Sequence, residues 1–84
     1  MASDAELLER MRQNPIGWRY AELARLLRRA GFLLVGGKGS HRRWKHALGA
    51  VVTIVDSAGE SKAAYVREVV QAITRAQGAR SEDS

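Results

Sequence analysis

The side chains best suited to chemistry lie together in one segment, GGKGSHRRWKH, residues 36–46. Cleavage of RNA without a metal ion needs a base for the proton of the ribose 2′-OH and an acid for the departing 5′-oxygen. It also needs cations to hold the growing phosphate charge. Histidine is the usual acid–base residue because its ordinary pKa is ~6.5. The segment supplies imidazoles, cations and a flexible backbone, so it contains each kind of group that this reaction uses.

Strand alternation would separate these side chains onto two faces. If residues 40–46 are extended, His41, Arg43 and Lys45 share one face, and the intervening side chains share the other. Trp44 is the largest apolar group of the segment, and we expect it to point toward the helices rather than to stack on a base. The opposite face would then present an imidazole beside two cations.

Phosphate contacts are expected from these cations and from the glycine-rich turn, whose backbone N–H groups can approach a phosphate closely. The candidates are Lys38, Gly39, Ser40, Arg42, Arg43 and Lys45. His41 could instead only cap the hairpin or bind phosphate, and spacing alone favours that interpretation over catalysis. The general acid that would act with His41 could be either Lys38 or His46. Alternation places His46 on the face opposite to His41 unless a bulge rotates it. On that face it would only form a local hydrogen bond beside the turn.

Hydrophobic periodicity and turn residues predict the order α-α-β-β-β-α. We expect helices at residues 4–12, 18–30 and 61–77, and strands at 32–35, 40–46 and 51–55. Ser3 and Glu6 fit a capping box at the first helix. Ser61 is the expected cap of the last helix, and Gly78 its end. The order favours an α+β fold in which a three-stranded antiparallel sheet packs one face on the helices and leaves the other free.

Length and composition limit the functions that the chain can have. The chain has 84 residues, enough for one small domain, which we place at 1–78 with a disordered tail at 79–84. The absence of cysteine excludes disulfides and thiolate zinc sites, and we expect no metal or cofactor. No apolar run approaches the roughly 20 residues of a membrane span. The acidic start is not a signal peptide, so we expect a cytoplasmic protein without a membrane partner.

The charge is unevenly distributed along the chain. Net charge is +5, and residues 25–45 contain half of the 14 Lys and Arg residues and no acid. Such a basic middle indicates a polyanionic partner, which could be a nucleic acid or an acidic protein. A generally basic surface without a specific partner is the alternative, and charge alone does not decide between them.

A strand leading into Gly-Ser-His, followed by a basic and aromatic strand that ends in a second histidine, occurs here as GFLLVGGKGSHRRWKH. This arrangement resembles the hallmark of the HicA toxin family. The neighbouring helices are similar to those of the family in LARLLRRAGF and YVREVVQAI. The front segment, ELLERMRQNPIGWRYAEL, looks like the extended N-terminus of one subgroup. The resemblance covers roughly residues 6–76.

The resemblance implies a function as well as a fold. HicA-like proteins are small bacterial mRNA interferases of type II toxin–antitoxin pairs, with a fold similar to the double-stranded-RNA-binding domain. By this resemblance His41 is the catalytic histidine of a metal-independent endoribonuclease. The partner would be a HicB-like antitoxin that covers His41 and the basic face. The turn at residues 47–49 and the segment at residues 55–57 lack the prolines of many members, which puts their loop geometry in doubt.

Two other functions remain open from the residues alone. A non-catalytic RNA-binding module of the same fold would need the basic face but not the imidazole. A DNA-binding helix-turn-helix is suggested by WRYAELARLLRRAGF. We rank it last, because a recognition helix should follow the turn and the chain continues there as a strand and a glycine loop.

Overall fold

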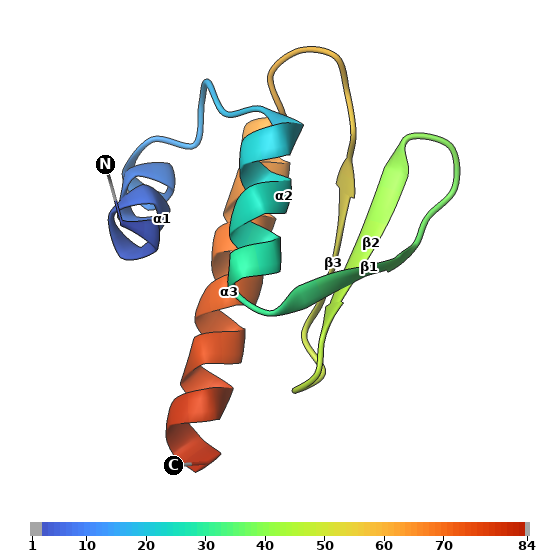
Figure 1. The fold of residues 1–84 in the computed structure, drawn as a ribbon. Helices are drawn as coiled ribbons and strands as arrows, with labels where there is room; N and C mark the ends of the chain where they lie inside the picture. Colours follow the sequence, from blue (N-terminus) through green and yellow to red (C-terminus); the bar gives the residue numbers. More distant parts are fainter. Residues whose placement is uncertain (1–2, 84) are drawn as a thin grey trace.

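The computed structural model describes the backbone of residues 3–83 and the side chains of residues 3–78. The elements are α1 (Asp4–Gln13), α2 (Tyr20–Arg29), β1 (Phe32–Gly36), β2 (His41–His46), β3 (Val51–Val55) and α3 (Ala63–Asp83) (Figure 1). The strands form one antiparallel sheet in the order β1-β2-β3. The predicted α+β class and the order α-α-β-β-β-α are confirmed, and the arrangement is consistent with a double-stranded-RNA-binding-domain fold.

The helices cover one face of the sheet and leave the other exposed (Figure 1). Cross-strand partners share a face, so the register determines what each face carries. The largest fully buried side chains are Trp44, Phe32, Met11, Leu23, Leu27, Ile54, Ile73, Val66 and Val69. The exposed side of the sheet, called the open face below, carries Leu33, His41, Arg43, Lys45, Val51 and Thr53. The sheet therefore has an apolar side and a side available to a partner.

The first and last helices pack together, since α1 packs on α3 and buries Leu8 and Met11. The hydroxyl of Ser3 accepts a hydrogen bond from the Glu6 N–H at 3.2 Å, which confirms the Ser3 half of the predicted capping box. Asp4 pairs with Arg29 of α2 at 2.8 Å, although both side chains are about half exposed. An exposed pair of this kind adds little stability, so α1 is held mainly by its buried apolar side chains.

The segment between α1 and α2 runs beside the loop between β3 and α3. The carbonyl oxygen of Trp18 accepts a hydrogen bond from the Ser61 N–H at 2.7 Å. Arg19 forms an isolated β-bridge with Glu60, and its guanidinium donates to the Ala58 carbonyl at 3.4 Å. This loop, which follows the strand paired with His41, is thus fixed by residues far from it in sequence.

Two predictions about α3 are wrong. Its first turn is closed by Lys62, whose carbonyl accepts from the N–H groups of Tyr65 and Val66. Ser61 lies one position further out, and its buried hydroxyl has no partner among the described residues. The helix also continues past Gly78 to Asp83. The division into a domain at 1–78 and a tail at 79–84 stays a prediction, and Ser84 lies outside the described residues. None of the described helices is long and apolar enough to cross a membrane.

Candidate functional site

His41 is the first residue of β2 and directly follows the glycine loop, residues 37–40. Its N–H donates to the Lys38 carbonyl at 3.0 Å and so closes this loop. Its partner on the edge strand β3 is Val55. The imidazole is exposed, and no hydrogen bond ties it to the side chains or backbone of residues 3–78. The ring is therefore available to a molecule that approaches from solvent.

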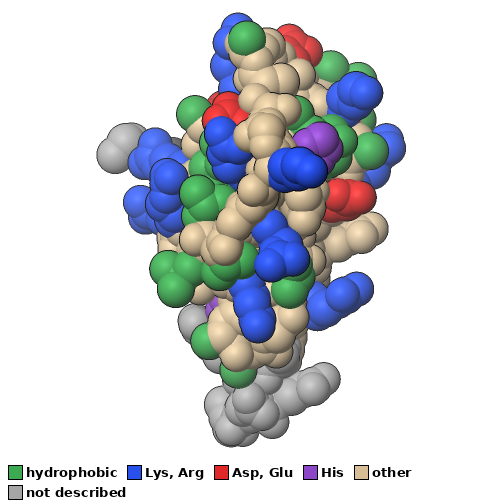
Figure 2. Space-filling view, turned by 90° about the vertical axis from the view of Figure 1, so that its right-hand side faces the viewer, with side chains coloured by type: hydrophobic (Ala, Val, Ile, Leu, Met, Phe, Trp, Pro, Cys, Tyr) green, Lys and Arg blue, Asp and Glu red, His purple; other side chains and the backbone are tan. Residues whose placement is uncertain are grey.

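The structure brings together most of the side chains that the sequence singled out. His41, Arg43 and Lys45 are all exposed on the open face, as alternation along β2 predicts. Lys38, Gly39 and Ser40 are exposed in the adjoining glycine loop. Figure 2 shows this side of the molecule, where Lys and Arg side chains are spread among hydrophobic ones and acids are few. The result is a positively charged surface with an imidazole on it, which suits a phosphate-containing ligand.

Arg42 is not brought to this surface. It is half-buried on the helix side of the sheet. Its guanidinium hydrogen-bonds the carbonyl oxygens of Gly39 and His41 and pairs with Asp56 at 3.7 Å. The Asp56 N–H in turn donates to the Ser40 carbonyl at 2.7 Å. Arg42 therefore holds the glycine loop against the end of β3, instead of presenting its charge to a ligand.

Sequence reasoning did not identify Asp56 as part of this arrangement. The signal was present in the strand register. Once a turn at residues 47–49 joins β2 to β3, counting outward places Val55 opposite His41 and Asp56 opposite Ser40. An acidic residue at that position is well placed to pair with a cation at the start of β2.

Replacing Arg42 with alanine should loosen the glycine loop without unfolding the domain. The substitution removes hydrogen bonds to two carbonyls and a partly exposed ion pair. We expect a loss of about 1 kcal/mol in the free energy of unfolding, because hydrogen bonds of this kind contribute modestly and exposed pairs little. Hydrogen exchange should accelerate at residues 38–41 while the core amides are unaffected. Unchanged exchange in this loop would contradict the role assigned to Arg42.

The backbone of the glycine loop requires glycine at position 37. Gly37 has a φ of +143°, a conformation that residues with a side chain rarely adopt. A Cβ built on it would lie 1.9 Å from the His41 carbonyl oxygen and 3.1 Å from the Arg42 Cα. The loop thus passes directly against the backbone of the residue that carries the exposed imidazole.

His46 is separated from His41 by the sheet. It is buried, 4% exposed, with its ring edge-on to Phe32 at 5.1 Å between centroids. Its Nδ1 accepts the Leu48 N–H at 3.1 Å, which stabilises the turn after β2. The predicted local hydrogen bond is confirmed. No bulge rotates the ring to the open face, so the structure does not bring His46 to His41 as a second proton-transfer group.

Trp44 belongs to the core, as expected. It is 1% exposed, and the guanidinium of Arg28 lies 5.2 Å from the centroid of its ring. A cation over an indole ring contributes a favourable electrostatic interaction. The ring is therefore covered by α2 and is not available for stacking on a nucleobase.

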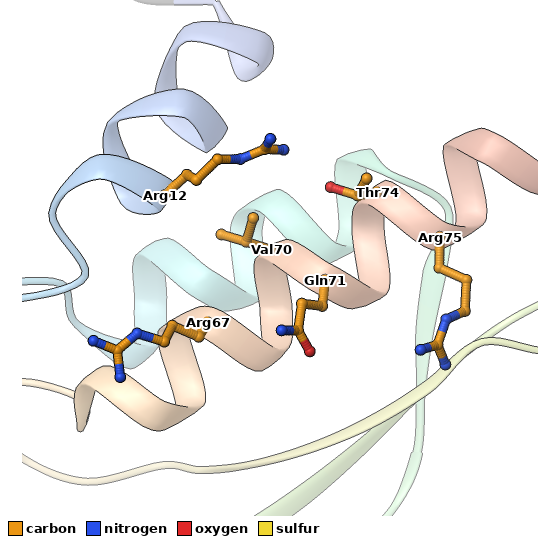
Figure 3. A pocket seen from close by; sticks show the side chains of 6 residues that line it. All are labelled: Arg12, Arg67, Val70, Gln71, Thr74 and Arg75. Atoms are coloured by element: carbon orange, nitrogen blue, oxygen red, sulfur yellow. The ribbon is translucent and has the colours of Figure 1, made fainter.

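A groove of about 690 Å³ between α1 and α3 lies away from these residues. Its lining comprises Arg12, Arg67, Val70, Gln71, Thr74 and Arg75 (Figure 3). The three guanidinium groups point in different directions and do not converge on one point (Figure 3). None of these residues is in the sheet, so the groove is separate from the surface that carries His41.

The acidic side chains and histidines of the described residues do not gather into a metal site. No three of them lie in a group that could hold a metal ion. The open face presents an imidazole with neighbouring ammonium and guanidinium groups, which can transfer a proton and stabilise a phosphate.

Comparison with protein families identifies the chain. Residues 20–77 match the model of the family described as the HicA toxin of bacterial toxin-antitoxin. The matched range runs from α2 into α3 and includes the glycine loop, His41 and all three strands, whereas α1 lies outside it. A search of curated proteins finds no match. Because the family match spans more than half of the chain, the protein belongs to the HicA toxin family, and this membership implies an antitoxin partner.

Proposed function

We propose that this toxin is a metal-independent endoribonuclease that cleaves mRNA, with His41 as general acid/base on the 2′-OH and phosphate. The observation that carries the proposal is the position of His41. Its exposed imidazole directly follows the hydrogen-bonded glycine loop and lies on the same face as Arg43 and Lys45. These are the groups that in-line attack of a 2′-OH on the adjacent phosphate requires.

Each group has a separate task in this mechanism. The neutral imidazole of His41 accepts the 2′-OH proton as the oxygen attacks phosphorus. Arg43 and Lys45, with Lys38 from the loop, neutralise the charge that grows on the phosphate oxygens. The exposed backbone of Gly39 and Ser40 lets a phosphate approach closely. The departing 5′-oxygen takes its proton from an ammonium group or from water, since the second histidine is buried on the other side of the sheet.

Only one of the two histidines, His41, lies on the open face, and this supports a second candidate function. A non-catalytic RNA-binding module would use the same cations to hold RNA and would not need His41 as a base. Both candidates act on RNA in the bacterial cytoplasm. In both, a HicB-like antitoxin would neutralise the protein by covering His41 and the basic face.

The nature of the RNA ends separates the two candidates. The purified toxin should cleave RNA in the presence of EDTA and leave 2′,3′-cyclic phosphate and 5′-hydroxyl ends, because the attacking nucleophile is the 2′-OH. A chemically matched RNA with 2′-O-methyl groups should resist cleavage. Cleavage that stops in EDTA, or 5′-phosphate ends, would contradict the proposed mechanism.

Salt dependence provides the test for binding alone. Contacts from Lys38, Arg43 and Lys45 should make RNA affinity fall with a slope of about −2 in a plot of log K against log salt, since each phosphate contact on a single strand contributes roughly −0.7. Such binding with no cleavage at any pH between 5 and 9 would favour the RNA-binding module. Salt-independent binding would contradict both candidates.

A further inference from the structure

The outer edge of β1 is an exposed apolar strand. β1 pairs with β2 on one side, and within the described residues no strand pairs with its other side. Three consecutive large aliphatic side chains lie on it, with Leu33 71%, Leu34 48% and Val35 47% exposed. Proteins usually protect such an edge with charges, proline or a covering segment, because its free N–H and C=O groups accept another strand. A covering partner is therefore expected here.

The two faces of β1 offer different contacts to a strand added at this edge. Leu33 is opposite Lys45 on the open face. Leu34 is opposite Trp44 on the helix side, where Arg28 covers the indole. An added strand would alternate its side chains in the same way. Those on one face would contact Leu33 and Lys45, and those on the other would contact Leu34 and the end of α2.

A hollow lies beside the C-terminal end of β1. The register shifts between Leu34 and Gly36, which places a bulge at Val35. A hollow of about 390 Å³ lies immediately beyond, lined by Leu34, Gly36, Gly37 and Arg42. A bulge interrupts regular pairing, so an added strand would pair with the first residues of β1. Its next side chains would then enter this hollow.

Charge indicates which partner occupies the edge. Every charged residue between positions 25 and 45 is a Lys or Arg. A second copy of this chain, paired through β1, would bring two such acid-free segments together and would be repelled. A partner segment that alternates apolar and acidic residues would satisfy both Leu33 and the surrounding cations. Membership of the HicA toxin family implies a protein partner, the antitoxin.

We propose that the antitoxin docks by adding an extended, acidic and apolar segment to the outer edge of β1. This inference rests on the proposed pairing with a HicB-like antitoxin and adds to it the place and manner of contact. Main-chain hydrogen bonds to β1 anchor the segment, and its apolar side chains cover Leu33 and Leu34. From this anchor the body of the antitoxin extends over the open face toward His41, one strand away.

Hydrogen exchange tests the main-chain part of the proposal. The probe is the purified cognate antitoxin, added in excess to the full-length toxin carrying His41→Ala. Those amides of β1 that point away from β2 should exchange at least about tenfold more slowly in the complex, because strand addition gives them hydrogen-bond acceptors. The amides of the outer edge of β3 serve as the internal reference. Equal exchange of the β1 amides in the free and bound toxin would overturn the proposal.

A pair of matched substitutions tests the side-chain part. Leu33 and Val51 flank Lys45 on the open face and lie on opposite edges of the sheet. Leu33→Glu removes an apolar contact and repels an acidic segment, so it should raise the Kd for the antitoxin about tenfold or more. Val51→Glu makes the same change on the other edge and should have a much smaller effect. Equal effects of the two substitutions would refute docking at β1.

These readouts do not depend on catalysis. Binding and exchange are measured without RNA, so a toxin that fails to cleave RNA would refute the proposed function and leave this inference standing. Circular dichroism should show both glutamate variants folded, since both positions are exposed. Sedimentation of the free toxin provides a further outcome. A dimer that Leu33→Glu converts into a monomer would show that a second copy covers this edge and would overturn the proposal.

Discussion

RNA cleavage should fall by about 10²–10⁴-fold when His41 is replaced by alanine, the range over which a general acid/base group contributes to a reaction. The protein should remain folded, because the side chain is exposed and makes no hydrogen bond within residues 3–78. Surface substitutions of this kind change stability by no more than about 0.5 kcal/mol. The measurement pairs initial rates on a labelled RNA with the melting temperature of each protein.

The second histidine provides a matched control for this experiment. His46 is buried against Phe32 and accepts the Leu48 N–H. His46→Ala should therefore destabilise the domain by about 2 kcal/mol or more. Below its melting temperature this variant should still cleave RNA. The two histidines thus separate chemistry from stability within one strand. Undiminished cleavage by a folded His41→Ala protein would show that His41 is not the catalytic residue.

Substitution of Gly37 by alanine should damage both stability and activity. The added Cβ would lie 1.9 Å from the His41 carbonyl oxygen and 2.9 Å from its carbon. Both atoms are backbone, so no side-chain rotation relieves the clash, and the positive φ adds strain. We expect a loss of about 2–4 kcal/mol in the free energy of unfolding. Because the clash displaces His41 itself, cleavage should fall by about 10²-fold even where the protein is folded.

The neighbouring glycine offers the control. A Cβ on Gly36 would meet no atom within 4 Å, and its φ lies outside the left-handed region. Gly36→Ala should therefore retain the melting temperature and the cleavage rate of the unmodified toxin. Chemical denaturation and initial rates of both variants, measured side by side, make the comparison. A Gly37→Ala protein as stable and active as Gly36→Ala would mean that the loop does not hold this conformation in solution.

The sequence predicted the arrangement of β2 well because strand alternation is a local property. Trp44 is too large and apolar to remain exposed beside water, and this fixes the face of every other residue in the strand. His41, Arg43 and Lys45 follow onto the open face. The six elements were predicted for the same reason, since helical and strand periodicities can be recognised within a short window.

The remaining features depend on contacts between distant residues. The sequence predicts that Arg42 binds phosphate. The register of β3 instead places Asp56 beside Arg42, and the pair holds the glycine loop. Ser61 reads as a helix cap, but its N–H is bound to Trp18 and the helix begins two residues later. The need for glycine at position 37 follows from an approach to the His41 backbone that only the folded loop shows.

The packing of α1 on α3 has a consequence for synthesis of the toxin. A ribosome makes α1 and the sheet well before α3, yet α3 supplies Val66, Val69 and Ile73 to the core that these earlier elements share. Until α3 leaves the exit tunnel, the nascent chain contains His41 but lacks the part of the core that α3 supplies. Domains generally fold as units during translation, so we expect the open face to acquire its shape only after α3 has emerged. Under the proposed function, an unfinished chain would then lack the arrangement that cleaves the message encoding it.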